Sequence, residues 1–360
     1  MSVSVANGIY PASESDRETN PGASLANYKI VHFGDVVYNS MRMWQGAVDA
    51  SRYDGIVSPA YVVTRPISEV YARFFARLLR QPMLLKQYQQ VSQGNSKDTQ
   101  VLKFDDFASI GISMPASENE QRRIGGFFDR LDSLITLHQR KYDKLVIFKK
   151  SMLEKMFPKD GESVPEIRFA GFTDPWEQRK LVDIAEIVGG GTPDTNNSNY
   201  WDGDIDWYAP AELGNNIYAE SSTRKITQAG FDSCSTKMLP ADKTILFTSR
   251  AGIGNTAILR HSACTNQGFQ SLVIGDADVY FVYSMSERIK KWAEEKASGS
   301  TFLEISGRQL ETMPVNLPSL VEQQAIGSFF SHLDDLITLH QRKLELLRNI
   351  KKSLLDKMFA

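Results

Sequence analysis

Hydrophobic residues recur every three to four positions over two long stretches of the chain, residues 120–157 and 322–359. The apolar side chains fall on the two core positions of a heptad, which form two rows along each predicted helix. The first row contains Ile124, Leu131, Leu145 and Met152 in the first stretch, and Ile326, Leu333, Leu347 and Leu354 in the second. The second row contains Phe127, Leu134 and Phe148 in the first stretch, and Phe329, Leu336 and Ile350 in the second. A period of 3.5 residues held over about five heptads is typical of a coiled-coil seam. We therefore predict two helices, each about 57 Å long at ~1.5 Å per residue.

The two stretches are copies of one element. At an offset of 202 residues they are identical at 24 of 38 positions, and both contain the heptapeptide ITLHQRK. Each copy begins with a Ser-x-x-Glu capping box, Ser117 with Glu120 and Ser319 with Glu322, which indicates a helix start. Pro158 follows the first copy and cannot continue a helix.

The heptapeptide places polar side chains at core positions of the predicted seam, namely His138, Lys141, His340 and Lys343. Polar residues in a seam cost stability but specify alignment. Two interpretations stay open: these layers fix the register of the helix pair or dock a partner, or they are solvated residues of a splayed section. Metal binding by the histidines is disfavoured, because no carboxylate or second histidine lies at ligand spacing on the same turn.

The segments outside the helices show short alternating apolar runs, such as KTILFTS and FQSLVIG, separated by Gly, Asn, Asp and Pro clusters. This pattern predicts strands, together with one shorter helix at Tyr280 to Lys296. The run VVYNS in the first segment matches ILFTS in the second, so both segments follow one plan. We predict a mixed α/β fold with a first globular domain at 1–116, a long helix at 117–158, a linker at 159–165, a second globular domain at 166–318 and a long helix at 319–360.

The two globular segments differ at their beginnings. About 40 residues precede the first shared landmark in the second segment, and only a few precede it in the first. We therefore expect the first domain to be shortened at its N-terminus and to lack its opening strands. The sequence leaves open whether this domain is functional, a silent or phase-variable fragment, or the result of a misplaced start.

Composition narrows the function. The 360 residues are 42% hydrophobic and 23% charged, as in ordinary globular proteins, and the net charge of −2 gives no general attraction to nucleic acid. Any DNA contact must then come from local patches. Without a signal sequence or an apolar run of ~18 residues we expect a cytoplasmic protein with no membrane partner. The two cysteines, Cys234 and Cys264, are expected to be reduced thiols.

Four further motifs accompany the repeated helix: NSMRMWQGAV at 39–48, GGGTPD at 189–194, SRAGIGNTAI at 249–258 and SGSTFLEIS at 298–306. Together they resemble the specificity subunits of type I restriction-modification systems over nearly the whole chain. The resemblance implies two target recognition domains, each gripping one half of a split, asymmetric site in double-stranded DNA. It also implies that the two long helices pack antiparallel as a spacer.

The resemblance further implies a non-catalytic subunit that recruits two methyltransferase subunits and, in the full complex, two restriction subunits. S-adenosylmethionine, ATP and Mg are then expected in those partners, with no cofactor in this chain. The sequence agrees, because it contains no phosphate loop, no NPPF-type methyltransferase motif and no HExxH. The alternatives are a truncated or silent cassette that still binds methyltransferase, and a coiled-coil scaffold without DNA readout.

Sequence readout requires side chains that pair with base edges or hold phosphates. The candidates are Thr248, Ser249, Arg250, Asn255 and Gln267 in the second domain, and Asn39, Ser40, Arg42, Gln45 and Lys97 in the first. Arg42 and Arg250 are the strongest of these, and the alternative is that the set forms turns of a strand-loop-strand frame. The aromatic residues Tyr200, Trp201, Trp207 and Tyr208 are expected in the core rather than stacked on DNA. No catalytic residue and no metal site are predicted.

Overall fold

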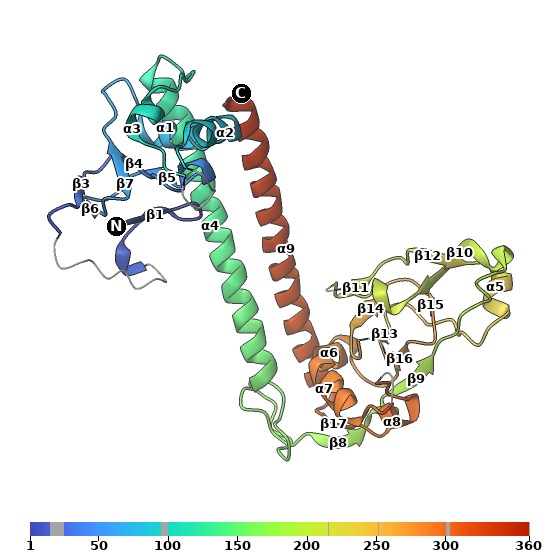
Figure 1. Cartoon of the computed structure of the whole chain (residues 1–360). Coiled ribbons are helices and arrows are strands. Elements are labelled where there is room, and N and C mark those ends of the chain that lie inside the picture. The colour runs from blue at the N-terminus through green and yellow to red at the C-terminus, as the bar shows by residue number, and fades with distance from the viewer. Residues whose placement is uncertain (15–24, 95–99, 215, 251, 300–302, 360) are drawn as a thin grey trace. The chain divides into compact units, whose positions relative to one another are not determined.

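The computed structural model describes residues 1–14, 25–94, 100–214, 216–250, 252–299 and 303–359. The chain divides into two compact units, Met1–Gln139 with Arg342–Ala360 (unit 1) and Arg140–Gln341 (unit 2). Two long helices, α4 (Glu118–Lys155) and α9 (Leu320–Met358), contribute one part to each unit (Figure 1). The two copies of the repeated element are therefore helical over nearly their whole length.

Unit 1 contains short antiparallel strands. These are a hairpin of β1 (Ser2–Ser4) and β2 (Gly8–Tyr10), a pair of β3 (Lys29–Val31) and β6 (Gly55–Val57), and a sheet in the order β5 (Val48–Ala50), β4 (Val36–Asn39), β7 (Tyr61–Thr64). Central strand β4 is buried on both faces. Val36 and Tyr38 belong to a core shared with the helices, and Val37 belongs to a core shared with β1, β2, β3 and β6.

Three short α-helices complete the described part of unit 1: α1 (Ala72–Leu78), α2 (Pro82–Val91) and α3 (Phe104–Ala108). Helix α1 is bound to α4 by Arg73 and Arg77, which both donate hydrogen bonds to the carboxylate of Asp129. Burial favours the protonated form of Asp129, but the bonds and charges of the two guanidinium groups outweigh it and hold the pKa of this carboxyl below its usual range. Asp129 is therefore a charged anchor between two helices.

The described residues of unit 2 form three sheets. The first sheet has the strand order β11 (Tyr218–Ala219), β14 (Thr256–Leu259), β13 (Thr244–Phe247), β16 (Gln270–Ile274), β9 (Ala185–Gly189). The second has the order β12 (Arg224–Ile226), β10 (Trp201–Tyr208), β15 (Cys264–Thr265). The third pairs β17 (Pro314–Leu317) with β8 (Glu177–Lys180). The pairs β11–β14 and β10–β15 are parallel, and the others are antiparallel.

The helices of unit 2 other than α4 and α9 are α5 (Gln228–Asp232), α6 (Val279–Ser284), α7 (Ser286–Lys296) and α8 (Gly307–Glu311). The single helix predicted at Tyr280 to Lys296 is thus divided at Met285. The hydroxyls of Ser284 and Ser286 donate to the carbonyls of Tyr280 and Tyr283, and such bonds compete with the regular helix ladder. Helix α6 packs against β13 and β14 (Figure 1).

Strands β4 and β13 occupy the same place in their units, as the match of VVYNS with ILFTS predicted. Each is flanked by two antiparallel neighbours, β5 and β7 in unit 1, and β14 and β16 in unit 2. The sheet of unit 2 continues, because β9 pairs with β16 and β11 pairs with β14. Within the described residues of unit 1, no further strand pairs with the outer edge of β5 or of β7.

The two helices pair antiparallel within each unit, as the resemblance implied. The contacts are Asp132–Lys351 at 2.6 Å and Phe128–Phe359 at 5.9 Å between ring centroids in unit 1, and Lys149–Asp334 at 2.5 Å and Phe157–Phe330 at 6.1 Å in unit 2. At the offset of 202 residues, Asp132 corresponds to Asp334 and Lys149 to Lys351, and Phe128 corresponds to Phe330 and Phe157 to Phe359. Each contact therefore occurs once in each unit, with the two copies of the repeat exchanged. The duplication in sequence is therefore a duplication of the helix pairing.

The first core row of the predicted heptad is buried or half-buried, whereas most of the second row is exposed. Leu131, Ile326 and Leu333 of the first row are buried, whereas five residues of the second row, Phe127, Leu134, Phe148, Leu336 and Ile350, are 38–46% exposed. Phe128 and Phe330, one position further on, are fully buried. Phe128 and Phe330 lie about 100° around the helix from the second row but only about 40° from the first, so the buried face is displaced from the predicted seam towards the globular domain.

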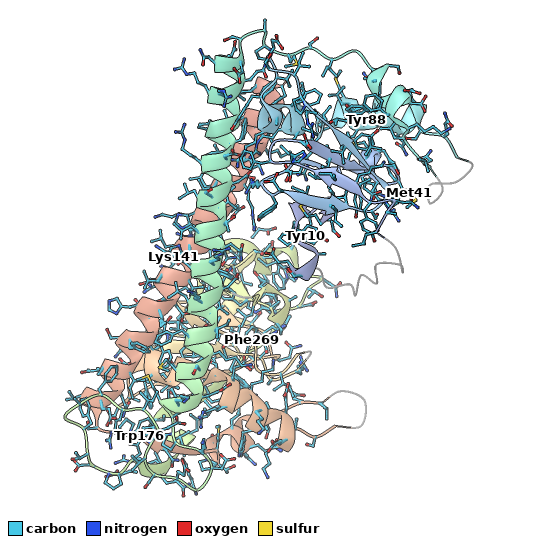
Figure 2. All side chains as sticks on the ribbon, turned by 90° about the vertical axis from the view of Figure 1, so that its left-hand side faces the viewer. Tyr10, Met41, Tyr88, Lys141, Trp176 and Phe269 are labelled. Atoms are coloured by element: carbon cyan, nitrogen blue, oxygen red, sulfur yellow. The ribbon has the colours of Figure 1, made fainter. Side chains whose placement is uncertain are left out.

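The polar residues of the heptapeptide also fall outside a buried layer. Lys141, labelled in Figure 2, and Lys343 are exposed, and His138 and His340 are half-buried. Whether these layers fix the register or dock a partner, or are solvated residues of a splayed section, stays a prediction.

Candidate DNA interface

Several of the sequence motifs meet in unit 2. They are the loop after β9 at 190–192, the described parts of the β13–β14 loop at 248–250 and 252–255, the β15–β16 turn at 266–269 and the segment before α8 at 303–306. Backbone hydrogen bonds join them: Gly191 N–H donates to Thr265 O at 2.9 Å, Ser249 N–H to Gly268 O at 2.8 Å and Ile305 N–H to Ser249 O at 3.0 Å. We call this assembly the loop cluster.

Close approach of backbones explains the glycine-rich motif GGGTPD. A Cβ atom on Gly190 would lie 2.2 Å from the carbonyl oxygens of Thr265 and Asn266, and one on Gly191 would lie 2.7 Å from the backbone nitrogen of Thr236. Only glycine fits at both positions. The glycines therefore serve to pack the loop cluster.

Thr248 and Ser249 support the β13–β14 loop from inside. Thr248 is fully buried, and its hydroxyl donates to Gly252 O at 2.6 Å and accepts from Asn255 N–H at 2.9 Å. Ser249 is fully buried too, and its hydroxyl has no partner within the described chain. The prediction that these two hydroxyls contact DNA is therefore incompatible with their burial.

The other three candidates of unit 2 reach the surface. Arg250 is partly exposed, and no carboxylate of the described chain pairs with it. Gln267 is exposed, and its Oε1 accepts a hydrogen bond from the hydroxyl of Thr192, which the sequence did not single out. Asn255 is partly exposed at the end of the loop. The loop cluster thus presents a guanidinium and two carboxamides, which are the groups that pair with guanine and adenine edges.

Unit 1 has a loop at the equivalent place, between β4 and β5. Asn39 Oδ1 accepts from Met41 N–H at 3.0 Å, and the Ser40 hydroxyl donates to Ala60 O at 2.7 Å, so both side chains brace the turn. Arg42 is exposed and unpaired within the described chain, and Gln45 is half-buried. Exposed Met41 lies in this loop (Figure 2). Lys97 lies outside the described residues.

Arg42 and Arg250 therefore occupy corresponding positions. Each follows the central strand of its unit, in the loop that leads to the antiparallel neighbour. Of the ten predicted DNA-binding residues, Arg250, Asn255 and Gln267 reach the surface on the loop cluster of unit 2, and Arg42 is the most accessible of the described candidates in unit 1.

The aromatic residues before and within β10 belong to the core, as expected. Trp201, Trp207 and Tyr208 are buried, and Tyr200 is partly buried beside them. Arg224 of β12 lies over Trp201, with its guanidinium carbon 3.7 Å from the ring centroid. This cation–π contact joins residues on neighbouring strands, so no local sequence pattern could reveal it.

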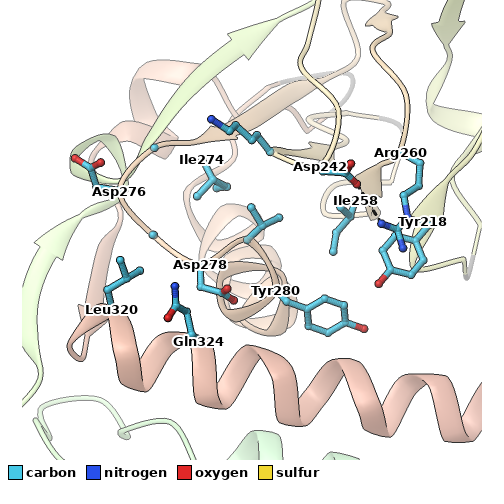
Figure 3. A pocket seen from close by; sticks show the side chains of 14 residues that line it. Tyr218, Asp242, Ile258, Arg260, Ile274, Asp276, Asp278, Tyr280, Leu320 and Gln324 are labelled. Atoms are coloured by element: carbon cyan, nitrogen blue, oxygen red, sulfur yellow. Dashed lines mark hydrogen bonds and ion pairs between the residues drawn. The ribbon is translucent and has the colours of Figure 1, made fainter.

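A separate pocket of about 580 Å³ lies between α6, the start of α9 and the edge of the five-stranded sheet (Figure 3). Arg260 in this pocket pairs with Asp242 at 3.1 Å and lies over the Tyr218 ring, and Asp278 caps α6 by accepting from Phe281 N–H at 2.8 Å. Its carboxylates, Asp276 among them, outnumber its cationic groups. The pocket is unsuited to a polyanion, so we do not count it as part of a DNA interface.

No other chemistry is apparent in the described part of the chain. No group of three or more His, Cys, Asp or Glu side chains there is arranged to hold a metal ion. Burial raises the pKa of the Cys264 thiol to about 12, so this cysteine is not a reactive thiolate. A search of the described residues for a helix both long and apolar enough to span a bilayer finds none.

A family model described as the type I restriction modification DNA specificity domain matches residues 7–146 and 173–349. The chain belongs to this family. It is 36% identical over 190 residues to the type I restriction enzyme MjaIX specificity subunit of Methanocaldococcus jannaschii, a match that covers 51% of this chain and 44% of that one. It is also 24% identical over 353 residues to the putative MjaX specificity subunit of the same organism, covering 92% of this chain and 79% of the relative.

Solved structures of specificity subunits share the fold. The S subunit from M. genitalium matches with a TM-score of 0.54 and 17% identity, covering 92% of this chain and 84% of that one. The HsdS subunit from Thermoanaerobacter tengcongensis matches with a TM-score of 0.50 and 19% identity, covering 94% and 83%. The mixed α/β architecture with two globular domains and two long helices is therefore that of type I specificity subunits.

Proposed function

We propose that this chain is the DNA-recognition subunit of a type I restriction-modification complex and that it reads a bipartite site in double-stranded DNA. The observation that carries the proposal is the loop cluster of unit 2, on which Arg250, Asn255 and Gln267 are at least partly exposed. Arg42, in the corresponding loop of unit 1, is proposed to contribute to the second half-site. In this reading the chain itself does no chemistry, and methylation and cleavage belong to partner subunits.

We further propose that the long helices recruit two methyltransferase subunits through repeated apolar positions. Leu134 and Leu137 on α4 and their repeat mates Leu336 and Leu339 on α9 are 40–49% exposed. The same exposed pair thus occurs once in each unit, which supports two equivalent docking sites. Exposed apolar residues that recur in this way are typical of an interaction surface.

Methylation mapping tests the recognition role. Genomic DNA from cells that express the chain with its methyltransferase subunit would be read by single-molecule sequencing, and a bipartite motif with a fixed gap is expected. Arg250→Ala should relax or weaken one half-site by about 1–3 kcal/mol while the complex still assembles. Arg179→Ala is the matched control, because Arg179 forms an exposed ion pair with Glu177 on β8 and contributes little.

The outcomes separate the alternatives. Unchanged methylation of every site by the Arg250→Ala complex would contradict the assignment of Arg250. A palindromic motif would mean that unit 1 does not read DNA. The absence of any motif, together with gel shifts that show no sequence preference at any salt concentration, would favour a silent cassette or a scaffold.

Light scattering of the purified complex tests the partner sites. Leu134→Asp with Leu137→Asp should reduce the bound methyltransferase from two copies to one, because one of two equivalent surfaces becomes charged. Ile67→Asp with Met83→Asp is the control, since both side chains are exposed in unit 1 and neither residue belongs to a long helix. Retention of two copies by the α4 variant would contradict the docking proposal.

A further inference from the structure

A second pocket lies wholly within unit 2, where the segment after α4 meets helix α7 and strand β17. Its volume is about 460 Å³, within the range of pockets that hold small molecules in other proteins. Large apolar side chains form much of its wall, namely Phe157, Trp176, Met285, Trp292 and Met313. Such a wall favours a ligand with an apolar, ring-shaped body.

Arg288 brings a positive charge without a counter-ion to this wall. Its Nη1 donates to Pro158 O at 2.7 Å and its Nη2 donates to Phe157 O at 3.4 Å, so two backbone carbonyls orient the guanidinium. Arg288 forms no ion pair with a carboxylate of the described chain. Burial lowers the pKa of Arg288 and outweighs the opposing charge of Asp160, yet a guanidinium stays protonated in proteins. The pocket therefore contains a partly desolvated cation that attracts an anionic ligand.

The indole of Trp176 adds a hydrogen-bond donor without an acceptor. Trp176, labelled in Figure 2, is only 4% exposed, and its Nε1–H has no hydrogen-bond partner within the described chain. A buried N–H of this kind costs free energy until it meets an acceptor. The Trp176 ring lies against Phe157 at 5.9 Å between centroids, and the guanidinium carbon of Arg288 lies 5.5 Å from the centroid of that same Phe157 ring. The donor and the cation thus lie beside one phenylalanine in the wall of one pocket.

The other charged side chains of the pocket favour a ligand with a single negative charge. Lys159 and Lys291 line the pocket and are exposed, as are the carboxylates of Asp160 and Glu295. Together with Arg288 they make three cationic and two anionic groups. The two carboxylates would repel a ligand with several negative charges, whereas one carboxylate matches the planar fork of a guanidinium.

We propose that this pocket binds a small organic carboxylate with an aromatic or similarly apolar ring. The ligand carboxylate pairs with Arg288 and accepts a hydrogen bond from Trp176 Nε1. The ring of the ligand packs against Trp292 and the neighbouring methionines. No residue of the loop cluster lines this pocket, so the proposal does not rest on DNA recognition.

The test uses the full chain, isotope-labelled at the tryptophan indole nitrogens, with naphthoate as the probe. The chain contains five tryptophans, and the indole signal of Trp176 is assigned by its loss in Trp176→Phe. Naphthoate should shift the indole signals of Trp176 and Trp292 and reach saturation at about 1 mM or below. The signals of Trp201 and Trp207, which belong to a different core, should not move. Naphthamide, which has the same ring without the charge, should bind at least about tenfold more weakly.

Substitutions on α7 separate the contributions of the charges. Arg288→Gln should weaken naphthoate binding at least about tenfold, because it removes the cation but keeps a donor for the carbonyl of Pro158. Glu295→Gln should tighten binding about two- to threefold, since it removes a repelling carboxylate from an exposed position. Lys296→Gln is the matched control, an exposed cation at the end of α7 that does not line the pocket, and should leave the affinity unchanged.

Several outcomes would overturn the proposal. They are a Trp176 signal that naphthoate does not move, naphthamide binding as tight as naphthoate binding, or full affinity in a folded Arg288→Gln chain. Unchanged signals of Trp201 and Trp207 show that a variant is folded. If Arg288→Gln does not fold, Glu295→Gln decides, and an affinity no higher than that of the native chain overturns the proposal. Equal shifts with acetate at the same concentrations would also overturn it, because the ring would then not be recognised.

Discussion

The two halves of the molecule use one helix repeat in two different surroundings. The contacts between α4 and α9 occur twice, as Asp132–Lys351 and Lys149–Asp334, because both partners lie inside the duplicated sequence. The contacts that the long helices make with the globular part of each unit differ between the units, because the globular sequences have diverged. Position in the repeat therefore determines the helix pairing, whereas burial of a given helix residue depends on the domain beside it.

The largest expected difference concerns Glu322 and Glu120. Glu322→Ala should lower the free energy of unfolding by about 3–5 kcal/mol, since it leaves the guanidinium of Arg168 in a mostly buried site without its carboxylate. Glu120→Ala, on an exposed side chain, should change it by less than about 0.5 kcal/mol. Urea denaturation followed by tryptophan fluorescence measures both. Equal losses would contradict the contrast between the two units.

The second difference concerns Phe157 and Phe359. Phe157 is buried against Phe281, Phe330 and Trp176, so Phe157→Ala should cost about 3–5 kcal/mol. Phe359 has the matching contacts to Phe74 and Phe128 but stays half-buried, and Phe359→Ala should cost roughly half as much. The same denaturation measurement decides, and a greater loss for Phe359→Ala would sink the comparison.

Much of the fold could be predicted because it depends on local pattern. The capping boxes, the 3.5-residue period and the duplicated sequence predicted two long helices, and VVYNS and ILFTS predicted corresponding central strands. The prediction that the second heptad row is buried was wrong, because the same spacing of apolar residues can pack against a second helix or against a globular domain on an adjacent face. Phe128 and Phe330 are buried by such neighbours, and their partners are distant in sequence.

The sequence predicted which loops form the candidate site, but not which of their side chains reach the surface. Arg250 and Gln267 reach the surface, whereas Thr248 and Ser249 of the same loop cluster point inward. Sequence favours Thr and Ser equally for holding phosphate and for bracing a turn, and only the tertiary arrangement separates the two. The role of Thr192 beside Gln267 could not be predicted, because the two residues meet through the closure of separate loops.

A third prediction compares the two repeated ion pairs. Asp334 is buried and accepts from both Lys149 and the Tyr280 hydroxyl, whereas Asp132 and Lys351 are more exposed. Lys149→Met should therefore cost about 1–3 kcal/mol, and Lys351→Met about 0–1 kcal/mol. Thermal unfolding at low and high salt measures both, and the Lys351 variant should lose its small effect at high salt. Indistinguishable costs would mean that the surroundings of the pair do not matter.

The smallest expected effect is the pH dependence of one helix contact in unit 1. Asp129, which anchors α1 through Arg73 and Arg77, has Ser331 as its repeat mate, so the matching position in unit 2 cannot titrate. The pKa of Asp129 is lower in the folded state than the ordinary value of 3.8. The stability that Asp129 contributes is thus present above that value and is lost as the pH falls through the folded-state pKa.

Hydrogen exchange of α1 amides, corrected for the intrinsic rate, should increase below about pH 4 in the native chain. Asp129→Asn should show the faster exchange already at neutral pH and little further change on acidification. If exchange in the native α1 does not depend on pH in this range, the charged anchor does not hold the helix, and other contacts of α1, such as that of Phe74 with Phe359, bind it in unit 1.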